Sequence, residues 1–383
     1  MKKFRVGVVG LGHRGRLMFS LACNNFECAI PAAACDLLPR NWYETQWLMD
    51  EPMCETFPDT EFYNDYNKML DEANLDVVIV ETGADVHAEF CKKALEKNIN
   101  VLTDIPVVAN LQEAKTLWDT AQKSNAMISV GANPNEAKFS VLLQDYYKQG
   151  KLGKPYYMEA EYIHWFKDAE GIKGLHENGE WRRLLSPIRY CTHSLGPLLT
   201  IVSEELRYVS CFATGQHAKP EDYPANDITD DMQSALFRTE SGITCRILRN
   251  GRCRALLEEH SYRVFGTEGY MERIAYGFDN DIPEVIRFNS TVDDDEKLHE
   301  VSGEFMPPEY VGIADKKMHG GIDYALFDHF FKALTNGDAA PIPLKAGLEM
   351  TIPGIFAEES AKRGGELLKI TYPWDENWTG TFD

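Results

Sequence analysis

Val6-Gly7-Val8-Val9-Gly10-Leu11-Gly12-His13-Arg14-Gly15 is the stretch that decides the fold of this 383-residue chain. It begins with an apolar run typical of a buried strand, and a helical stretch from Arg16 to Cys23 follows it. Glycines spaced GxGxxG between a strand and a helix allow a tight turn, let the backbone approach a pyrophosphate and pack helix on strand. The helix N-terminus adds N–H groups for the phosphates. We therefore predict a dinucleotide-binding turn formed by Gly10, Leu11, Gly12, His13, Arg14 and Gly15.

An acidic residue follows the glycine turn at the spacing typical of a residue that binds the cofactor ribose. Asp36 follows Gly15 by twenty-one residues and ends the second strand-like run. A carboxylate at this place accepts hydrogen bonds from the ribose hydroxyls and repels a 2′-phosphate. The sequence therefore favours NAD over NADP, although Arg40, four residues further on, would soften that preference.

The first third of the chain alternates apolar runs with helical periodicity. Continuous apolar runs are typical of strands buried on both faces of a parallel sheet. The predicted strands are Val6–Val9, Ala29–Cys35, Val77–Val80, Ile99–Thr103 and Met127–Val130. Helical spacing between them, as in 85–97 and 111–124, indicates βαβ units. We expect an α/β protein whose residues 1–130 form a doubly wound, NAD-binding Rossmann domain.

Beyond residue 130 the pattern changes to strand-like alternation with short connections, which indicates a large, mostly antiparallel open sheet. The predicted strands are 156–163, 206–212, 234–238, 244–248, 261–265 and 270–274. Closing helices are expected at 324–336 and 345–362. We therefore assign residues 131–383 to an α/β substrate and oligomerisation domain, whose C-terminal helices could instead pack back on the first domain.

Composition excludes several classes of function. Sixty acidic against 39 basic residues give a formal net charge of −21, which repels nucleic acid and anionic lipid. No run of 18 apolar residues occurs, and nine scattered cysteines without a CxxC pair favour free thiols in a reducing compartment. We expect a soluble, cytoplasmic protein that binds neither nucleic acid nor membrane.

Together these motifs resemble a family, the glucose-fructose oxidoreductase, inositol dehydrogenase and rhizopine-catabolism superfamily of NAD(P)-dependent sugar enzymes. The matching stretches, beyond the glycine turn, are Asp76–Val80 followed by Thr82 and His87-Ala88-Glu89, Val101–Pro106, Gly150–Gly153, Trp181-Arg182 and Gly266–Gly269. The resemblance implies a Rossmann domain, a second domain with an open sheet, a carbohydrate substrate and a homo-oligomer, either a dimer or a tetramer. An open sheet face left in water would also favour association on physical grounds.

Two departures separate this chain from the family's dehydrogenases. Those enzymes usually carry Glu-Lys-Pro after the fifth strand, where the lysine assists proton movement, whereas this chain has Asp104-Ile105-Pro106. Isoleucine cannot carry a proton. The dehydrogenase motif Asp-x-x-x-His-x-x-Asp is also changed, because both acids are absent around His193.

A narrower resemblance accounts for these departures. Tyr190-x-Thr192-His193-x-Leu195-Gly196-Pro197 and the later His319-Gly320-Gly321-x-Asp323 are similar to the NAD-dependent glycosidases typified by α-N-acetylgalactosaminidases. Those enzymes also replace the lysine with an aliphatic residue. The resemblance implies transient oxidation of a sugar C3 hydroxyl, which acidifies the C2 proton, followed by loss of the aglycone, addition of water and return of the hydride.

Three residues form the candidate catalytic set. His193 is predicted to act as a general acid or base because imidazole titrates near neutral pH, and Tyr190 can share a hydroxyl proton with it. His319, next to two glycines, is predicted to lie on a loop that reaches into a cleft. A structural role is the alternative for each of them.

The resemblance extends the candidate NAD-binding set beyond the glycine turn and Asp36. It adds Thr82, His87, Asp104, Pro106, Trp181 and Arg182. His87 is expected at a helix start near the nicotinamide, and Asp104 is expected to line the cofactor. No metal site is predicted, because the nearest candidates lack ligand spacing such as HExxH. Those candidates are His164, His193 and His319 with Glu161 or Glu180.

Three functions remain open at this point. The first is an NAD-dependent oxidoreductase acting on a sugar, polyol or glycoside. The second is a glycosidase that uses NAD transiently. The third is a relative that binds a dinucleotide without catalysing a reaction.

Overall fold

A computed structural model describes residues 2–45, 51–163, 185–217, 230–250, 260–274, 284–293, 297–304, 306–312 and 319–382. The chain divides into two compact units, and each is described by itself. The first unit consists of Met1–Gly131 and Asp323–Gly347. The second unit consists of Ala132–Ile322 and Leu348–Asp383.

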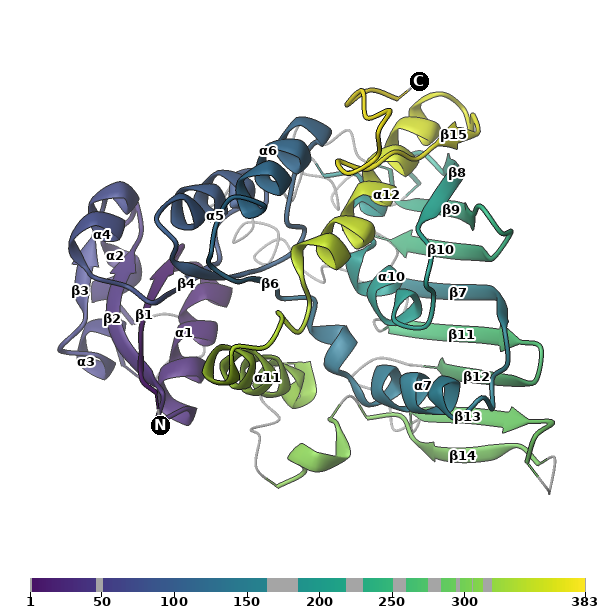
Figure 1. The fold of residues 1–383 in the computed structure, drawn as a ribbon, viewed down its shortest axis with the longest axis horizontal. Helices are drawn as coiled ribbons and strands as arrows, with labels where there is room; N and C mark the ends of the chain where they lie inside the picture. The colour runs from purple at the N-terminus through teal and green to yellow at the C-terminus, as the bar shows by residue number, and fades with distance from the viewer. Residues whose placement is uncertain are drawn as a thin grey trace. The chain divides into compact units, whose positions relative to one another are not determined.

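The first unit is built on a six-stranded sheet whose order is β3-β2-β1-β4-β5-β6, with every neighbouring pair parallel (Figure 1). Its strands are β1 (Phe4–Val9), β2 (Ala29–Cys35), β3 (Glu61–Tyr63), β4 (Val77–Val80), β5 (Asn100–Thr103) and β6 (Ile128–Val130). This is the order of a doubly wound nucleotide-binding sheet. The five strands expected from the sequence are confirmed within two residues at each end, and β3 was missed.

Helices cover both faces of this sheet. They are α1 (His13–Asn25), α2 (Arg40–Tyr43), α3 (Met53–Thr56), α4 (Tyr66–Glu72), α5 (His87–Glu96) and α6 (Leu111–Ala121). The start of α6 is fixed by Asn110, whose side chain accepts a hydrogen bond from the Glu113 N–H, while the Glu113 carboxylate accepts from the Ala109 N–H. This reciprocal arrangement is a capping box.

A late segment of the chain also belongs to the first unit. Helix α11 (Ile322–Asn336) packs through aromatic rings, with Phe26 and Tyr324 centroids 4.8 Å apart and Phe26 and Phe331 centroids 5.4 Å apart. The Val130 N–H donates to the Ile342 carbonyl oxygen at 2.9 Å, next to the last strand of the sheet. Residues 323–347 therefore add a helix and an extended segment to the Rossmann sheet.

The second unit contains a nine-stranded sheet of order β14-β13-β12-β11-β7-β10-β9-β8-β15. Its strands are β7 (Pro155–Ile163), β8 (Leu206–Ala213), β9 (Met232–Thr239), β10 (Thr244–Asn250), β11 (His260–Gly266), β12 (Gly269–Ile274), β13 (Val285–Ser290), β14 (His299–Ser302) and β15 (Leu368–Lys369). All neighbouring pairs are antiparallel except β10 and β7, which are parallel. The expected open, mostly antiparallel sheet is confirmed, although β13, β14 and β15 were missed.

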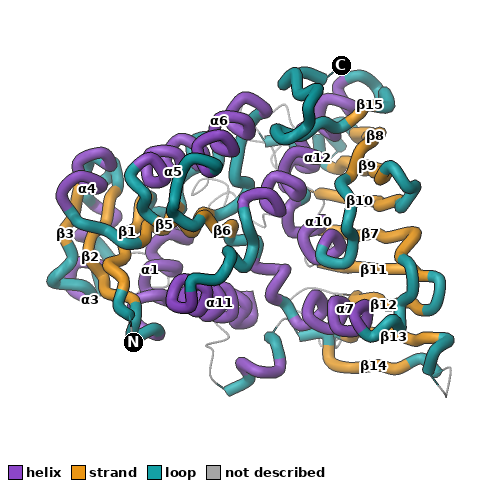
Figure 2. Tube along the Cα trace, in the orientation of Figure 1, coloured by secondary structure: helices purple, strands orange, loops and turns teal. Residues whose placement is uncertain are grey.

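Helices lie along one face of the nine-stranded sheet (Figure 2). The helical segments assigned to the second unit are η1 (Asn133–Glu136), α7 (Lys138–Lys148), η2 (Pro187–Tyr190), α10 (Thr192–Leu199), η4 (Pro308–Tyr310), η5 (His319–Gly321) and most of α12 (Leu344–Lys362). Along β7, the residues that face these helices are buried, as Met158 and Ala160 are, whereas Glu159 and Glu161 face the other way. The two-residue alternation thus separates an apolar face from a polar one.

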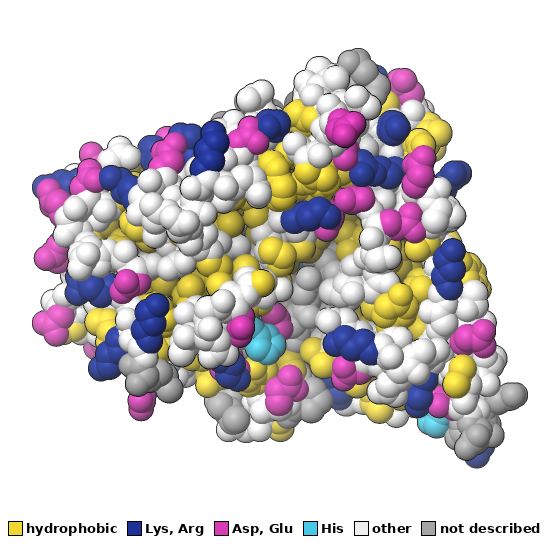
Figure 3. All heavy atoms as spheres, viewed as in Figure 1, with side chains coloured by type: hydrophobic (Ala, Val, Ile, Leu, Met, Phe, Trp, Pro, Cys, Tyr) yellow, Lys and Arg dark blue, Asp and Glu magenta, His cyan; other side chains and the backbone are white. Residues whose placement is uncertain are grey.

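Charged side chains of both signs are mixed on the surface, and the cysteines are not paired in the described segments. In the face drawn in Figure 3, the visible Lys and Arg side chains are scattered among Asp and Glu and do not gather into a patch. All eight cysteines of the described segments are free thiols, and six of them are buried. Burial disfavours the thiolate and so raises the pKa of Cys35, Cys91, Cys191, Cys211 and Cys245. Within the described ranges, no helix is both long enough and apolar enough to cross a membrane.

Candidate functional site

The predicted glycine turn joins β1 to α1 in the first unit. Gly10 has φ +87°, a left-handed conformation that glycine adopts without strain, and a Cβ there would lie 2.6 Å from the Glu81 carbonyl oxygen. A Cβ on Gly15 would lie 1.8 Å from the Gly10 carbonyl oxygen. A Cβ on Gly12 would meet nothing within 4 Å. The turn is therefore packed against protein at two glycines and open at the third, which begins the helix.

The N-terminus of α1 has the properties of an anion site. Gly12 is its N-cap, no side chain caps it, and its first turn holds no acidic residue. The first N–H groups of a helix have no partner inside the helix and carry partial positive charge. The Arg16 guanidinium donates to the Leu11 carbonyl oxygen at 2.8 Å and so braces the turn. A pyrophosphate fits the open Gly12 position and these N–H groups.

Asp36 directly follows β2, and its carboxylate is held against the same turn. Oδ2 accepts from the Leu11 N–H at 2.6 Å, while Oδ1 accepts from the Leu38 N–H at 2.7 Å and from Asn41 Nδ2 at 3.1 Å. A carboxylate has about four acceptor positions, so these bonds orient it and leave capacity for a ribose hydroxyl. Arg40 is exposed at the start of α2.

Replacing Asp36 is expected to narrow the difference between NAD and NADP. Asp36→Ala removes the charge that repels a 2′-phosphate, so we expect the ratio of the two dissociation constants, measured by calorimetry, to move toward 1 by at least about tenfold. Asp36→Asn is the matched control, because it keeps an oxygen acceptor while removing the charge. An unchanged ratio in both variants would rule out Asp36 as the discriminating residue.

Four further predicted cofactor residues lie at the ends of β4 and β5, which are neighbours in the sheet. Thr82 follows β4, and Asp104 and Pro106 follow β5. His87 is the first residue of α5, and its buried ring lies between the two loops, with Nε2 2.8 Å from the Thr82 carbonyl oxygen and Nδ1 3.0 Å from that of Pro106. His87 therefore lies between the two loops, with one ring nitrogen close to each of them. Ile105, at the position of the family's lysine, is 2% exposed.

The side chain of Arg14 points to carboxylates. Its two terminal nitrogens lie 2.6 and 2.8 Å from the two oxygens of Asp323 in the first turn of α11, and Nε lies 3.9 Å from Asp104. Burial works against the guanidinium charge, but the pair with Asp323 outweighs burial, so the pKa of Arg14 is raised. The buried Glu81 beside this pair was not predicted from the sequence. Its place directly after the apolar run of β4 was a signal that could have identified it as a candidate site residue.

The second unit brings aromatic and basic side chains from distant parts of the chain together. We call this group the histidine–tyrosine cluster. Its members come from β7, the end of η2, α10, β10 and β11, and they are Tyr162, Tyr190, His193, Arg249, His260 and Tyr262. Tyr190 and His193 are the two candidate catalytic residues among them. The sequence offered no local signal for Arg249, His260 or Tyr262.

His193 lies in the first turn of α10, a helix that contains both a glycine and a proline. Pro197 lies inside α10 and has no N–H to donate to the carbonyl oxygen of residue 193, four positions earlier. The Tyr262 hydroxyl donates to that oxygen instead, at 2.8 Å. Gly196 lets the helix approach η1, since a Cβ there would lie 2.2 Å from Asn135 Oδ1. Proline and glycine in this motif therefore position the histidine.

Ring geometry in the cluster is compact. The centroids of His193 and Tyr190 are 5.3 Å apart at an interplanar angle of 86°, and His193 and His260 show the same two values. Tyr162 lies 3.9 Å from His260 by centroid, and the Arg249 guanidinium carbon lies 3.8 Å from the Tyr162 ring. This last distance is short enough for a cation–π interaction. The neighbours of the His193 ring are therefore the imidazole of His260 and the phenol rings of the tyrosines.

Burial keeps His260 neutral. It lowers the pKa of His260 well below its usual value, and the nearby guanidinium groups of Arg273 and Arg249 act in the same direction. Arg249 itself is buried, and its guanidinium donates to the carbonyl oxygens of Tyr162 and Tyr190 at 2.9 and 3.3 Å. Arg249 therefore carries the permanent positive charge of the cluster.

The remaining predicted site residues are His319, Trp181 and Arg182. His319 is exposed, has φ +44° and precedes Gly320 and Gly321, which also have positive φ. Trp181 and Arg182 lie outside the described residues, as do His164 and Glu180. In the described ranges, no group of three or more His, Cys, Asp or Glu side chains is arranged to hold a metal ion.

Comparison with known proteins shows what this chain is similar to. Residues 4–132 match the model of the GFO_IDH_MocA group, described as "Oxidoreductase family, NAD-binding Rossmann fold". The chain is 24% identical to glycosyl hydrolase family 109 protein 1 of Shewanella sp. (strain ANA-3) over 400 residues. It is also 24% identical to the α-N-acetylgalactosaminidase of Shewanella oneidensis over 390 residues. Each of these alignments covers 94% of this chain and 83% of the relative.

Solved structures share the fold across the whole chain. Levoglucosan dehydrogenase in complex with NADH and levoglucosan superposes with a TM-score of 0.77 at 17% identity, covering 96% of this chain and 100% of the other. The predicted fold class, the enzyme class and NAD as the cofactor are confirmed by these comparisons together. The match of residues 4–132 to this family model, together with the two relatives, confirms the resemblance inferred from the sequence.

Proposed function

We propose that this protein is an NAD-dependent glycosidase that oxidises a ring hydroxyl transiently and cleaves a glycoside without net redox change. The observation that carries the proposal is the coexistence of a complete dinucleotide turn with a Tyr190–His193 pair, while Ile105 fills the position of the family's lysine. Similarity over 94% of the chain to an α-N-acetylgalactosaminidase supports it.

The first unit holds the cofactor in this proposal. Gly10, Gly12 and Gly15 shape the turn, the α1 N-terminus receives the pyrophosphate, and Asp36 receives the adenosine ribose. When bound, NAD accepts a hydride from a carbinol carbon and can return it. Asp104 and Thr82 line the cofactor from the ends of β5 and β4, and His87 holds their loops together.

The second unit supplies acid–base chemistry. Oxidation of a carbinol requires a group that takes the hydroxyl proton, and an imidazole is suited to that task near neutral pH. We assign the task to His193, with Tyr190 sharing the proton and the neutral His260 packed beside the imidazole. The carbonyl formed at C3 acidifies the C2–H. Loss of that proton expels the aglycone, water then adds at C1, and the proton returns to C2. Return of the hydride to C3 and of a proton to its oxygen would restore the hydroxyl, so that no net oxidation remains.

Aryl glycosides tested with and without NAD distinguish the alternatives. The proposal expects aryl alcohol release without accumulation of NADH, and incorporation of deuterium from D₂O at C2 of the released sugar. Stoichiometric NADH without aryl release would favour the second candidate, a sugar or polyol dehydrogenase, which the cofactor turn alone also supports. Binding of NAD with neither product, across a panel of glycosides and free sugars, would leave a non-catalytic dinucleotide-binding protein.

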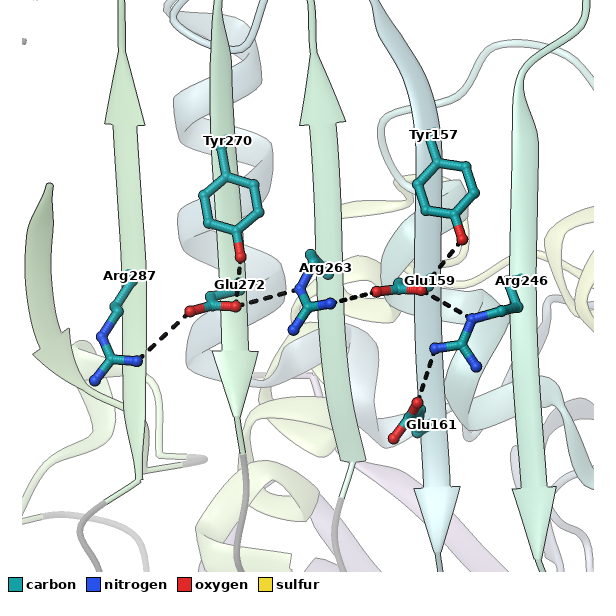
Figure 4. A network of polar contacts seen from close by, with 8 residues as sticks. All are labelled: Tyr157, Glu159, Glu161, Arg246, Arg263, Tyr270, Glu272 and Arg287. Carbon is teal, nitrogen blue, oxygen red and sulfur yellow. Dashed lines mark hydrogen bonds and ion pairs between the residues drawn. The ribbon is translucent and has the colours of Figure 1, made fainter.

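We also propose that two copies associate through the helix-free face of the nine-stranded sheet. Charged side chains from five neighbouring strands form a continuous network there (Figure 4). Glu159 accepts from Arg246 at 2.8 Å and from Arg263 at 2.6 Å, and Arg263 continues to Glu272 at 3.3 Å. The Glu159 and Glu272 side chains are only 12% and 11% exposed. Because arginines pair with these carboxylates, the face beside Phe265 can be covered by a second copy without leaving either carboxylate unpaired.

Light scattering at about 10 µM, far above the dissociation constant of a stable interface, is expected to show a dimer or tetramer. Arg263→Glu places a third carboxylate between Glu159 and Glu272 and is expected to shift the protein toward monomer. Lys92→Glu, on the exposed side of α5, is the charge-matched control and is expected to leave the mass unchanged. A monomeric parent protein would refute the association.

A further inference from the structure

The carboxylate of Asp36 has little acceptor capacity left for a cofactor. Each oxygen of a carboxylate can accept about two hydrogen bonds. Oδ1 already accepts from the Leu38 N–H at 2.7 Å and from Asn41 Nδ2 at 3.1 Å, while Oδ2 accepts from the Leu11 N–H at 2.6 Å. The free position is therefore on Oδ2. An adenosine ribose has both a 2′- and a 3′-hydroxyl that can donate, so the second of them needs another acceptor.

Asn41 is the polar side chain directly beside this carboxylate. Only the NH₂ end of an amide can donate to an ionised carboxylate, so the bond to Asp36 fixes which end of the Asn41 amide is nitrogen and which is oxygen. No donor from the described residues binds the amide oxygen, and this oxygen is not one of their fully buried, unpartnered polar atoms. Asn41 Oδ1 is therefore an acceptor open to a ligand next to Asp36.

The short helix α2 holds Asn41 in place without any cofactor. The Asn41 N–H donates to the Leu38 carbonyl oxygen at 3.0 Å. The next residue, Trp42, is 2% exposed and stacks on Phe62 of β3, with ring centroids 6.1 Å apart. Asn41 is therefore anchored to the parallel sheet through its neighbour in the chain. A side chain that is already fixed loses little conformational freedom when it binds a ligand.

The carboxyl–amide pair lies where a doubly wound sheet binds adenosine. Asp36 directly follows β2, and the Leu11 N–H that it accepts from belongs to the glycine turn. In such sheets an acidic residue at the end of the second strand binds the adenosine ribose. Residues 37–40, which connect the two members of the pair, are all exposed. A ribose at Asp36 is therefore the group that Asn41 is placed to meet.

We propose that Asn41 binds the adenosine ribose of NAD together with Asp36, one residue to each hydroxyl. Asp36 Oδ2 accepts from one hydroxyl and Asn41 Oδ1 accepts from the other. The hydrogen bond between the two side chains sets their relative orientation. This role rests on the ribose binding proposed above for Asp36 and adds a second residue to it. It is the same whether the bound NAD serves a glycosidase or a dehydrogenase.

NAD analogues that lack one hydroxyl of the adenosine ribose test this division. Calorimetry gives the dissociation constants of NAD, 2′-deoxy-NAD and 3′-deoxy-NAD. In the parent protein, loss of a hydroxyl is expected to weaken binding by about 10- to 100-fold where its partner is the carboxylate and by about 3- to 10-fold where its partner is the amide. Asn41→Leu is expected to weaken NAD binding by about 3- to 10-fold and to remove the effect of deleting one hydroxyl. Asp36→Ala is expected to remove the effect of deleting the other.

Two results would overturn the proposal. If both variants remove the effect of the same hydroxyl, Asn41 only orients Asp36. If Asn41→Leu leaves NAD affinity unchanged, or weakens all three ligands by the same factor, Asn41 does not contact the ribose. Asn41→Ala provides the same comparison should the leucine variant unfold.

An exposed asparagine provides the matched control. Asn67→Leu, in α4, is expected to keep all three dissociation constants of the parent protein. Failure of the parent protein to bind NAD would instead contradict the cofactor assignment.

Discussion

The His193→Gln variant is expected to fold and bind NAD like the parent protein while its turnover falls by about 10²- to 10⁴-fold, the range that general acid–base assistance contributes. The reason is chemical. Ile105 cannot take a hydroxyl proton, and His193 is the imidazole that the Pro197–Tyr262 arrangement holds in place beside Tyr190. Glutamine fills a similar volume and forms hydrogen bonds but does not titrate. The acidic limb of the pH–rate profile that reports histidine protonation is expected to disappear with it.

An exposed histidine provides the control for this variant. His217 lies at the surface after β8 and contacts the Thr214 carbonyl oxygen through Nε2 at 2.7 Å, so His217→Gln is expected to keep full turnover. Thermal unfolding of each protein separates loss of function from loss of folding. A decrease in turnover of less than about tenfold, well below the typical acid–base contribution, would point to a structural histidine. An equal decrease in NAD affinity would contradict the assignment as well.

The Rossmann unit was predicted well from the sequence because its signals, apolar runs and glycine spacing, each lie within a short stretch of the chain. Four-residue apolar runs such as Val77–Val80 are buried on both faces, and the glycine spacing is a property of one turn. The edge strand β3 was missed because three residues, one of them an exposed glutamate, carry no periodicity. Helix α10 was missed for the opposite reason. Its glycine and proline are typical helix breakers, and only the distant Tyr262 hydroxyl compensates for the absent proline N–H.

The sequence likewise predicted the candidate cofactor residues better than the histidine–tyrosine cluster. The candidate cofactor residues Asp36, predicted from its spacing, and Asp104, predicted from the family resemblance, directly follow strands at the carboxyl edge of the sheet. The histidine–tyrosine cluster cannot be assembled by such a rule, because Tyr162, Arg249 and His260 come from three strands whose order in the sheet, β11-β7-β10, differs from their order in the chain. Glu81 required the structure for another reason. Its burial, which raises the pKa of its carboxyl above the usual value, is not visible in a linear sequence.

Alanine at two glycines of the cofactor turn is expected to give opposite phenotypes. In Gly15→Ala the new methyl group would lie 1.8 Å from the Gly10 carbonyl oxygen, which is backbone and cannot move aside as the end of a flexible side chain could. We expect α1 to shift away from the turn at a cost of about 3 kcal/mol in the free energy of unfolding, the upper part of the range for overpacking. Denaturant titration measures this loss, and NAD binding is expected to be lost with it.

In Gly12→Ala the methyl group meets nothing within 4 Å, and the backbone at φ −60° and ψ −176° is open to any residue. The free energy of unfolding is therefore expected to stay within about 1 kcal/mol of the parent value, since only a modest N-cap preference changes. The same methyl group occupies the space through which a pyrophosphate reaches the α1 N-terminus. NAD affinity is expected to fall by about 10- to 100-fold, the equivalent of an overpacking cost of 1–3 kcal/mol. Unchanged NAD affinity in a stable Gly12→Ala protein would show that the phosphates do not bind at this turn.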